Sequence, residues 1–242
     1  MNNKFTTYFL YAIGEIILVV IGILIAVSIN NWNDVRKRRA SELHYLTNIK
    51  KDLILNNEEL DSYIGNRVQL IEYALEILEY YEGKELENPE LIFDKMLPIY
   101  TWERFFQTNN TFKELVNTGN FALISNEDIK AGLLNLEAQY LLMKATEAHF
   151  RFDSEVALFL PSYESVDHYK LYKNYLYRTT NGQMGENTEI KREDLAQLDD
   201  LRQKNGFVMA LAEFTKMNQQ MVEMKQMSFD LIAIIDTEKA NY

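Results

Sequence analysis

The chain has 242 residues, a formal net charge of −11 at pH 7 and no cysteine, which excludes disulfides, thiolate metal sites and cysteine nucleophiles. It holds three prolines and nine glycines, a scarcity that favours long helices over a strand-rich fold. Residues 1–39 carry five basic and two acidic side chains, so about −14 remains on the rest. Such an acidic domain repels nucleic acid, which we exclude as a partner.

The most apolar part of the chain is residues 9–29, FLYAIGEIILVVIGILIAVSI, in which Glu15 is the single charge. As a helix this segment extends for about 31 Å, the thickness of the hydrocarbon core of a bilayer. We assign a short tail to residues 1–7, a transmembrane helix to 8–32 and a basic juxtamembrane segment to 33–40. A cleaved signal peptide fits less well, because the apolar run is too long and no small-x-small cleavage site follows it.

The flanks of this segment carry the residue types that anchor helices at membrane interfaces. Aromatic side chains stand at both ends, and a basic cluster able to meet lipid phosphates follows. The predicted interface anchors are Tyr8, Tyr11, Trp32, Arg36, Lys37, Arg38 and Arg39. One lysine precedes the span and four basic residues follow it, so the positive-inside rule puts the large domain in the cytoplasm.

One face of the predicted membrane helix is small and polar. Glu15, Gly22 and Ala26 share this face at 3.6 residues per turn. Gly22 and Ala26 form a small-xxx-small step that lets another helix approach closely, and Glu15 is costly towards lipid. We interpret the three residues as a contact with a second copy or with a membrane protein partner. The alternative is that Glu15 snorkels to the nearby interface and the small residues make no contact.

Residues 41–242 are predicted to form an acidic, all-α domain. Its first helix covers about 41–82, because apolar residues recur there every three or four positions, and it can continue the membrane helix without a break. Gly83 ends this helix. A short helix over 89–95 follows and is stopped by Pro98.

The middle of the domain is predicted to hold a loop, a short helix and a second long helix. The loop carries an aromatic group that we interpret as core rather than as a binding cage: Trp102, Phe105 and Phe106. A short helix covers 111–119 with a glycine cap, and 120–124 is extended. A capping box of Ser125 and Asp128 then opens a helix that runs to about Leu160, before a proline.

The C-terminal part begins with a tyrosine-rich stretch at 162–190, in which we expect a helical turn near 168–177 and then a loop. Two further helices are predicted at about 192–204 and 207–240. The last helix carries Met217, Met221 and Met224, which we interpret as a core face rather than as an adaptable peptide groove. The fold class is therefore all-α: an N-terminal transmembrane helix followed by an antiparallel bundle of three or four long helices.

No catalytic, cofactor-binding or metal site is predicted. His44, His149 and His168 form no HExxH motif, and the absence of a Glu-x-x-His pair leaves a di-iron site unsupported. We interpret residues 117–120 as a helix cap rather than a phosphate loop, and no nucleophile elbow occurs. Since catalytic groups can assemble from distant positions, missing motifs disfavour an enzyme without excluding it.

Two stretches resemble a known family. Residues 11–33, YAIGEIILVVIGILIAVSINNWN, closely resemble the membrane segment of a flavobacterial family of unknown function, DUF6090. Residues 111–140 resemble its second hallmark, a short helix, a glycine cap and a long helix. The resemblance implies a single-pass, helical protein of the bacterial inner membrane, without catalytic residues that can be carried over. Relatives often begin with a longer basic leader, which implies a periplasmic domain and opposes the local charge count.

Two hypotheses from different classes follow. The first is a non-enzymatic anchor or protein-interaction module, whose partners are the lipid bilayer and a second copy or another membrane protein. The alternative is a membrane-anchored sensory bundle that binds a ligand and signals through a partner, because no output domain follows the bundle. The cavity expected for that alternative is lined by Trp102, Phe105, Phe106 and Tyr140.

Overall fold

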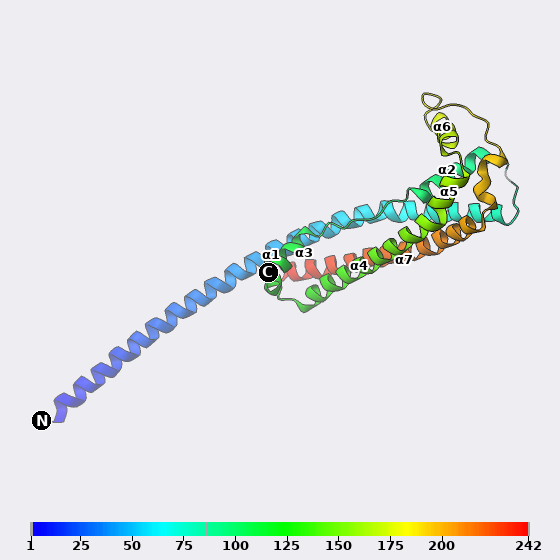
Figure 1. Cartoon of the computed structure of the whole chain (residues 1–242). Coiled ribbons are helices and arrows are strands. Elements are labelled where there is room, and N and C mark those ends of the chain that lie inside the picture. The colour runs from blue at the N-terminus through cyan, green and yellow to red at the C-terminus, as the bar shows by residue number, and fades with distance from the viewer. Residues whose placement is uncertain (1, 86, 242) are drawn as a thin grey trace.

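The chain folds into a helical bundle at one end of a very long helix (Figure 1). A computed structural model describes residues 2–85 and 87–241, without the side chains of 2–8, 11 and 12. The described residues form helices and no strand, so the predicted all-α class is confirmed. The elements are α1 (Asn2–Tyr81), α2 (Pro89–Tyr100), α3 (Asn110–Asn117), η1 (Asn120–Leu123), α4 (Glu127–Ser154), η2 (Glu155–Phe159), α5 (Leu160–Ser165), α6 (His168–Thr179), η3 (Arg192–Asp199) and α7 (Leu201–Ala240).

Helix α1 is 80 residues long and serves two environments. Its first half projects alone from the bundle, and its second half is one of the bundle's walls (Figure 1). The predicted continuity is confirmed, because no break separates the apolar part from the part that packs. We call residues 13–29 of this helix the apolar segment. Among the side chains of α1 that the structure describes, the first buried one is that of Glu42.

The bundle has three long helices, α1, α4 and α7. Helix α7 runs antiparallel to α1. The ion pairs and hydrogen bonds between the two helices keep one register along the whole contact. From one pair to the next, the number of residues advanced along α1 equals the number of residues moved back along α7. These pairs are Thr47–Lys239, Lys50–Asp236, Asp61–Lys225 and Glu82–Lys204. A constant register over this length is typical of straight, evenly packed helices.

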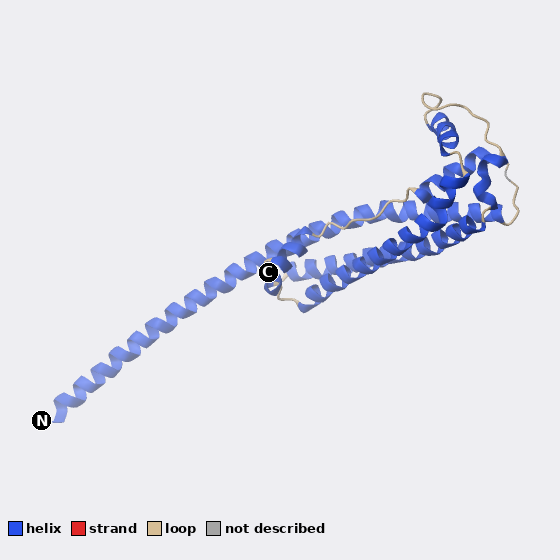
Figure 2. Ribbon diagram, viewed as in Figure 1, coloured by secondary structure: helices blue, strands red, loops and turns tan. Residues whose placement is uncertain are grey.

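Helix α4 runs in the same direction as α1, because the chain returns along the bundle before α4 begins (Figure 2). The return segment, residues 101–109, and helix α3 descend along α1 in reverse order. Polar contacts fix this path: Arg67 donates to the Glu103 carbonyl at 3.0 Å, Asn56 exchanges two hydrogen bonds with Thr108, and the Thr111 N–H donates to Asp52 at 3.1 Å. The backbone of the return segment is therefore paired by side chains of α1 rather than by a strand.

The core consists of two clusters along the bundle. The cluster far from the apolar segment is built on α2 and the first half of α7, and includes Phe93, Met96, Phe150, Phe207, Phe214 and Met217. The nearer cluster includes Leu46, Leu53, Leu60, Phe105, Ile129, Met221 and Met224. All three methionines singled out in the sequence are buried, so their interpretation as a core face is confirmed.

Two prolines lie inside helices, contrary to the predicted stops. Pro98 sits in the last turn of α2, which ends two residues later at Tyr100. Pro161 sits in the first turn of α5, where a missing N–H costs little. Directly before α5 the chain widens into the π-helical turn η2, and the N–H of the next residue, Leu160, donates to the Glu155 carbonyl. The path of α4 therefore continues through η2 into α5 instead of ending.

Helix starts differ from prediction in three places. Asn126, not Ser125, caps α4, and its side chain accepts hydrogen bonds from the N–H groups of Asp128 and Ile129. Of the residues 120–124 predicted to be extended, only Ile124 is, since residues 120–123 form the 3₁₀ turn η1 after Gly119, a left-handed residue at φ 72°. The long C-terminal helix begins at Leu201, capped by the Asp200 side chain, and a 3₁₀ helix, η3, precedes it.

Candidate functional site

The apolar segment packs against nothing in the described part of the chain. Its large side chains are all solvent exposed, and the helix is long and apolar enough to cross a membrane by length and composition. Glu15, Gly22 and Ala26 are exposed with it, and a Cβ on Gly22 would meet no atom within 4 Å. So long an apolar surface is costly in water, and an environment outside the chain has to cover it.

Most of the predicted interface anchors whose side chains are described are exposed to solvent, but one of them packs into the bundle. The side chains of Tyr8 and Tyr11 lie outside the described part of the structure. Trp32 is exposed, and the Arg36 guanidinium lies 5.3 Å from the centre of its ring. Arg36, Lys37 and Arg38 are exposed, but the side chain of Arg39 is only 17% exposed.

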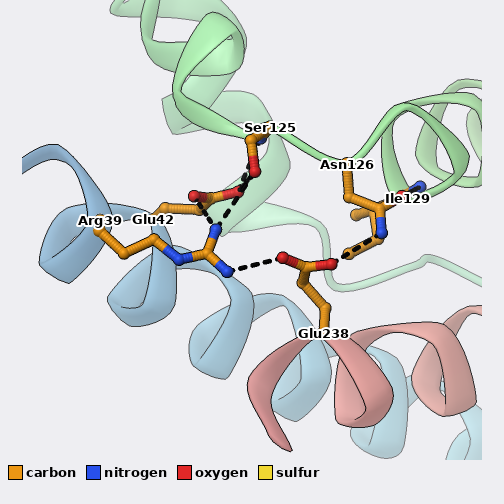
Figure 3. A network of polar contacts seen from close by, with 6 residues as sticks. All are labelled: Arg39, Glu42, Ser125, Asn126, Ile129 and Glu238. Carbon is orange, nitrogen blue, oxygen red and sulfur yellow. Dashed lines mark hydrogen bonds and ion pairs between the residues drawn. The ribbon is translucent and has the colours of Figure 1, made fainter. Parts of the chain in front are cut away.

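Arg39 joins the three long helices at the end of the bundle next to the apolar segment (Figure 3). Its guanidinium pairs with Glu42 on its own helix, donates to Ser125 Oγ at 3.2 Å and pairs with Glu238 on α7 at 2.6 Å. Glu238 also accepts a hydrogen bond from Asn126, the cap of α4, at 2.9 Å. Arg39 therefore has an intramolecular role, and the predicted lipid contact falls to the other three basic residues.

Glu42 is the buried acceptor of this junction network. Its carboxylate accepts from the Ser125 N–H at 2.6 Å and from Ser125 Oγ at 2.8 Å, in addition to its pair with Arg39. Burial by itself raises the pKa of Glu42, but the hydrogen bonds from Ser125 and the Arg39 charge outweigh it, so the pKa lies below its usual value. The network therefore stabilises a charged carboxylate where α1 enters the bundle.

The outward face of α4 carries an uncharged apolar stripe at helical spacing. Its members, all exposed, are Leu134, Ala138, Leu141, Ala145, Ala148, Phe152, Val156, Leu160 and Tyr163. We call this set the α4 seam. Steps of four and three residues place these side chains on one face as far as Phe152, which is 70% exposed.

The π-helical turn keeps the α4 seam straight. After Phe152 the apolar residues come at two successive steps of four, to Val156 and Leu160, which is one residue more than two α-helical turns contain. The wider turn at η2 absorbs that extra residue, so the stripe stays on one face through α5. Without it, Glu155 would occupy the seam position. Sequence analysis missed the seam because inward and outward apolar positions alternate on this helix.

The cavity expected for a sensory bundle is not assembled. Phe105 is buried in the core, so its interpretation as core is confirmed, whereas Phe106 is 62% exposed and its interpretation as core was wrong. Tyr140 packs edge-on against Phe105. A cleft of about 340 Å³ lies between α1, the end of α2 and the return segment, and of the four residues Trp102 alone borders it.

The described residues contain no group of three or more His, Asp and Glu side chains placed to hold a metal ion. His149 is exposed and lies 3.3 Å from Asp153 on the next helical turn. Asp167 caps α6 by accepting from the Lys170 N–H at 3.0 Å. These side chains have structural explanations of their own.

Fold and surfaces together define a class: a three-helix bundle on a long helix, part of which could span a membrane. The chain belongs to a family of unknown function, DUF6090, whose family model matches residues 15–157. The match extends from Glu15 through the apolar segment, the return segment and α4 into η2. No curated protein matches the chain, and no solved structure matches it.

Proposed function

We propose that the chain is a single-pass protein of the bacterial inner membrane whose bundle is a non-enzymatic interaction module. The exposed apolar segment supports the membrane anchor, because lipid would cover the large side chains of this segment, which do not pack against the bundle. The basic residues 36–38 follow it at the position of the lipid headgroups. The junction network then attaches α4 and α7 to the anchoring helix directly above the membrane surface.

The observation that carries the interaction role is the α4 seam. It extends for about 45 Å along the helix and contains no charge, whereas monomers rarely expose so long an apolar strip. Alternating leucine and alanine at steps of three and four is the spacing of a coiled-coil contact. The seam therefore supports docking of another helix along α4.

The occupant that the geometry favours is a second copy of the chain. Two copies in one bilayer present α4 at the same height and in the same direction, because α4 starts beside the junction network and runs parallel to α1 (Figure 1). Each residue of the seam then lies near its own counterpart, as in an isologous contact whose two-fold axis runs along the helices. The residues Glu15, Gly22 and Ala26 supply an additional helix contact within the membrane.

Disulfide crosslinking tests the seam directly, because the chain has no cysteine of its own. Ala145→Cys places a thiol in the seam, and Ala212→Cys places one at an exposed alanine of α7 as a matched control. In oxidised membranes we expect a dimer of the full chain from Ala145→Cys and none from Ala212→Cys, since a disulfide needs Cα atoms about 6 Å apart. Equal crosslinking of both, or of neither, would overturn the second-copy seam, as would crosslinking to a different protein.

The membrane contact has a separate test. Gly22→Ile meets no atom of the chain itself, so any loss of dimer is intermolecular in origin. Gly14→Ile is the control, because Gly14 is equally open and lies off the face of Gly22. We expect Gly22→Ile to reduce the crosslinked dimer several-fold more than Gly14→Ile does. Unchanged crosslinking would remove the membrane contact from the proposal and leave the seam.

The same cysteine variants decide on which side the bundle lies. The local charge count favours the cytoplasm, and analogy with relatives that begin with a longer basic leader favours the periplasm. Ala212→Cys in intact cells reacts with a membrane-impermeant maleimide only if the bundle is periplasmic. Labelling that requires cell lysis assigns the bundle to the cytoplasm.

A further inference from the structure

Arg67 is the most deeply buried charged side chain on α1 that lacks a full set of partners. It is 3% exposed, and its Nη2 donates to the Glu103 carbonyl at 3.0 Å. Its Nε and Nη1 groups have no hydrogen-bond partner in the described structure. Buried donors are nearly always paired, so two unpaired donor nitrogens on one buried cation indicate a missing acceptor.

The surroundings of Arg67 hold the guanidinium but do not supply that acceptor. Its central carbon lies 5.1 Å from the ring centre of Trp102 and 4.7 Å from that of Phe214. Aromatic faces attract a cation without accepting its N–H groups in plane. Burial lowers the pKa of Arg67 to about 10, an effect that the charge of Glu147 opposes, so the side chain stays charged at neutral pH. Glu147 itself pairs with Lys144.

Arg67 also borders the cleft of about 340 Å³, a volume within the range of small-molecule sites. The walls are aromatic and polar in alternation, with Tyr63, Asn66, Gln69, Tyr73, Thr101 and Trp102 among them. A flat apolar body can lie against the rings while an acidic group approaches Arg67.

We propose that this cleft binds a small organic carboxylate with a flat apolar body, whose acid group supplies the acceptors that Arg67 lacks. A planar carboxylate matches the fork of a guanidinium. Glu103 lines the same cleft with its side chain exposed, which disfavours a second negative charge on the ligand. The charge of Glu103 is felt inside the cleft, because burial first and this charge second raise the pKa of Tyr63. The site thus prefers a monoanion to a phosphate dianion, and it is independent of the interaction role proposed above.

The chain carries its own reporter for this site. It has two tryptophans, Trp32 beside the apolar segment and Trp102 in the cleft. In full-length Trp32→Phe protein in detergent, tryptophan fluorescence therefore reports Trp102 alone. We expect saturable changes with benzoate, with a dissociation constant in the millimolar range or tighter, at least tenfold weaker binding of the uncharged isostere benzamide, and weaker binding of phenyl phosphate. No saturation by benzoate, or equal binding of benzoate and benzamide, overturns the proposal, whereas tighter binding of phenyl phosphate overturns the preference for a monoanion.

Variants separate recognition from folding. Arg67→Gln should abolish benzoate binding. Because it alters the core, Asn66→Asp serves as a second test, placing a negative charge at an exposed position of the cleft wall. We expect it to weaken benzoate several-fold, while Asn135→Asp, an exposed control on α4, changes nothing. Glu103→Gln should tighten benzoate and phenyl phosphate. Unchanged affinity in both Arg67→Gln and Asn66→Asp overturns the assignment, and neither result bears on crosslinking through the seam.

Discussion

The two halves of α1 are one continuous helix but have opposite relations to the rest of the chain. In the apolar segment every large side chain is exposed, whereas beyond Glu42 buried residues recur every three or four positions, apart from one wider gap between Leu60 and Arg67. The exposed half is the more apolar of the two, so burial in the fold does not follow hydrophobicity here. The first half is therefore long and apolar enough to cross a membrane, whereas the second half packs against the rest of the bundle.

The largest effect should come from charging the apolar half. Ile21→Arg combined with Ile25→Arg puts two charges at the centre of the segment, at a cost of about 2.5–3.5 kcal/mol each if it lies in lipid. We expect the protein to leave the carbonate-resistant membrane fraction while the thermal unfolding of the bundle stays unchanged. Val208→Arg, at an exposed apolar position of α7, should keep the protein in that fraction. Retention of the double variant in membranes would contradict the anchor.

The second change removes a core side chain that packs against the second half of α1. Phe214 is fully buried and packs against the ring of Phe150 at 4.9 Å and the guanidinium of Arg67. Phe214→Ala should lower the free energy of unfolding by about 3–5 kcal/mol, because the cavity left in the far cluster cannot close completely. Phe229→Ala, at an exposed ring of the same helix, should cost less than about 1 kcal/mol. Membrane association should be the same in both variants.

Features of the fold that depend on local sequence could be predicted, whereas features that depend on contacts made on folding could not. Long helices, the continuity of α1 and the methionine core face follow from local periodicity, which survives in the fold. The predicted stop before Pro161 was wrong because Pro161 lies in the first turn of α5, where a missing N–H costs little, and because the π-turn before it is a tertiary accommodation. Pro98 lies in the last turn of α2, and the helix ends two residues after it, so this stop was predicted too early. Asn126 displaced Ser125 as the cap because Ser125 is engaged by Glu42, more than 80 residues away in sequence.

The candidate sites likewise divide into local patterns, which sequence could predict, and contacts made on folding, which it could not. The apolar segment and its small face are local patterns and were predicted, although no contact in the described chain tests them. Arg39 was assigned to lipid because its neighbours are basic, but its partners Ser125 and Glu238 become adjacent only on folding. The unpaired N–H donors of Arg67 could not be predicted for the same reason. They depend on which hydrogen-bond acceptors the return segment places beside α1 in the folded chain.

The smallest and most specific effect is expected at the boundary between the two halves, where Glu42 can be tested by pH. Because the pKa of Glu42 is lowered in the folded state, its stabilisation is complete above its ordinary pKa and is lost as the pH falls through the lowered value. Glu42→Gln should lower the free energy of unfolding by about 1–3 kcal/mol at pH 7, since Ser125 and Arg39 lose a charged acceptor.

That deficit should shrink as the pH is lowered below 4.5, because the wild-type carboxylate then takes up a proton and loses the same contacts. Denaturant unfolding of the full-length protein in detergent at pH 7 and at acidic pH measures both differences. Glu127→Gln, a highly exposed carboxylate in the first turn of α4, should show a small effect at pH 7. A Glu42→Gln deficit that is independent of pH would mean that Glu42 contributes shape and hydrogen bonds rather than charge to the point where α1 enters the bundle.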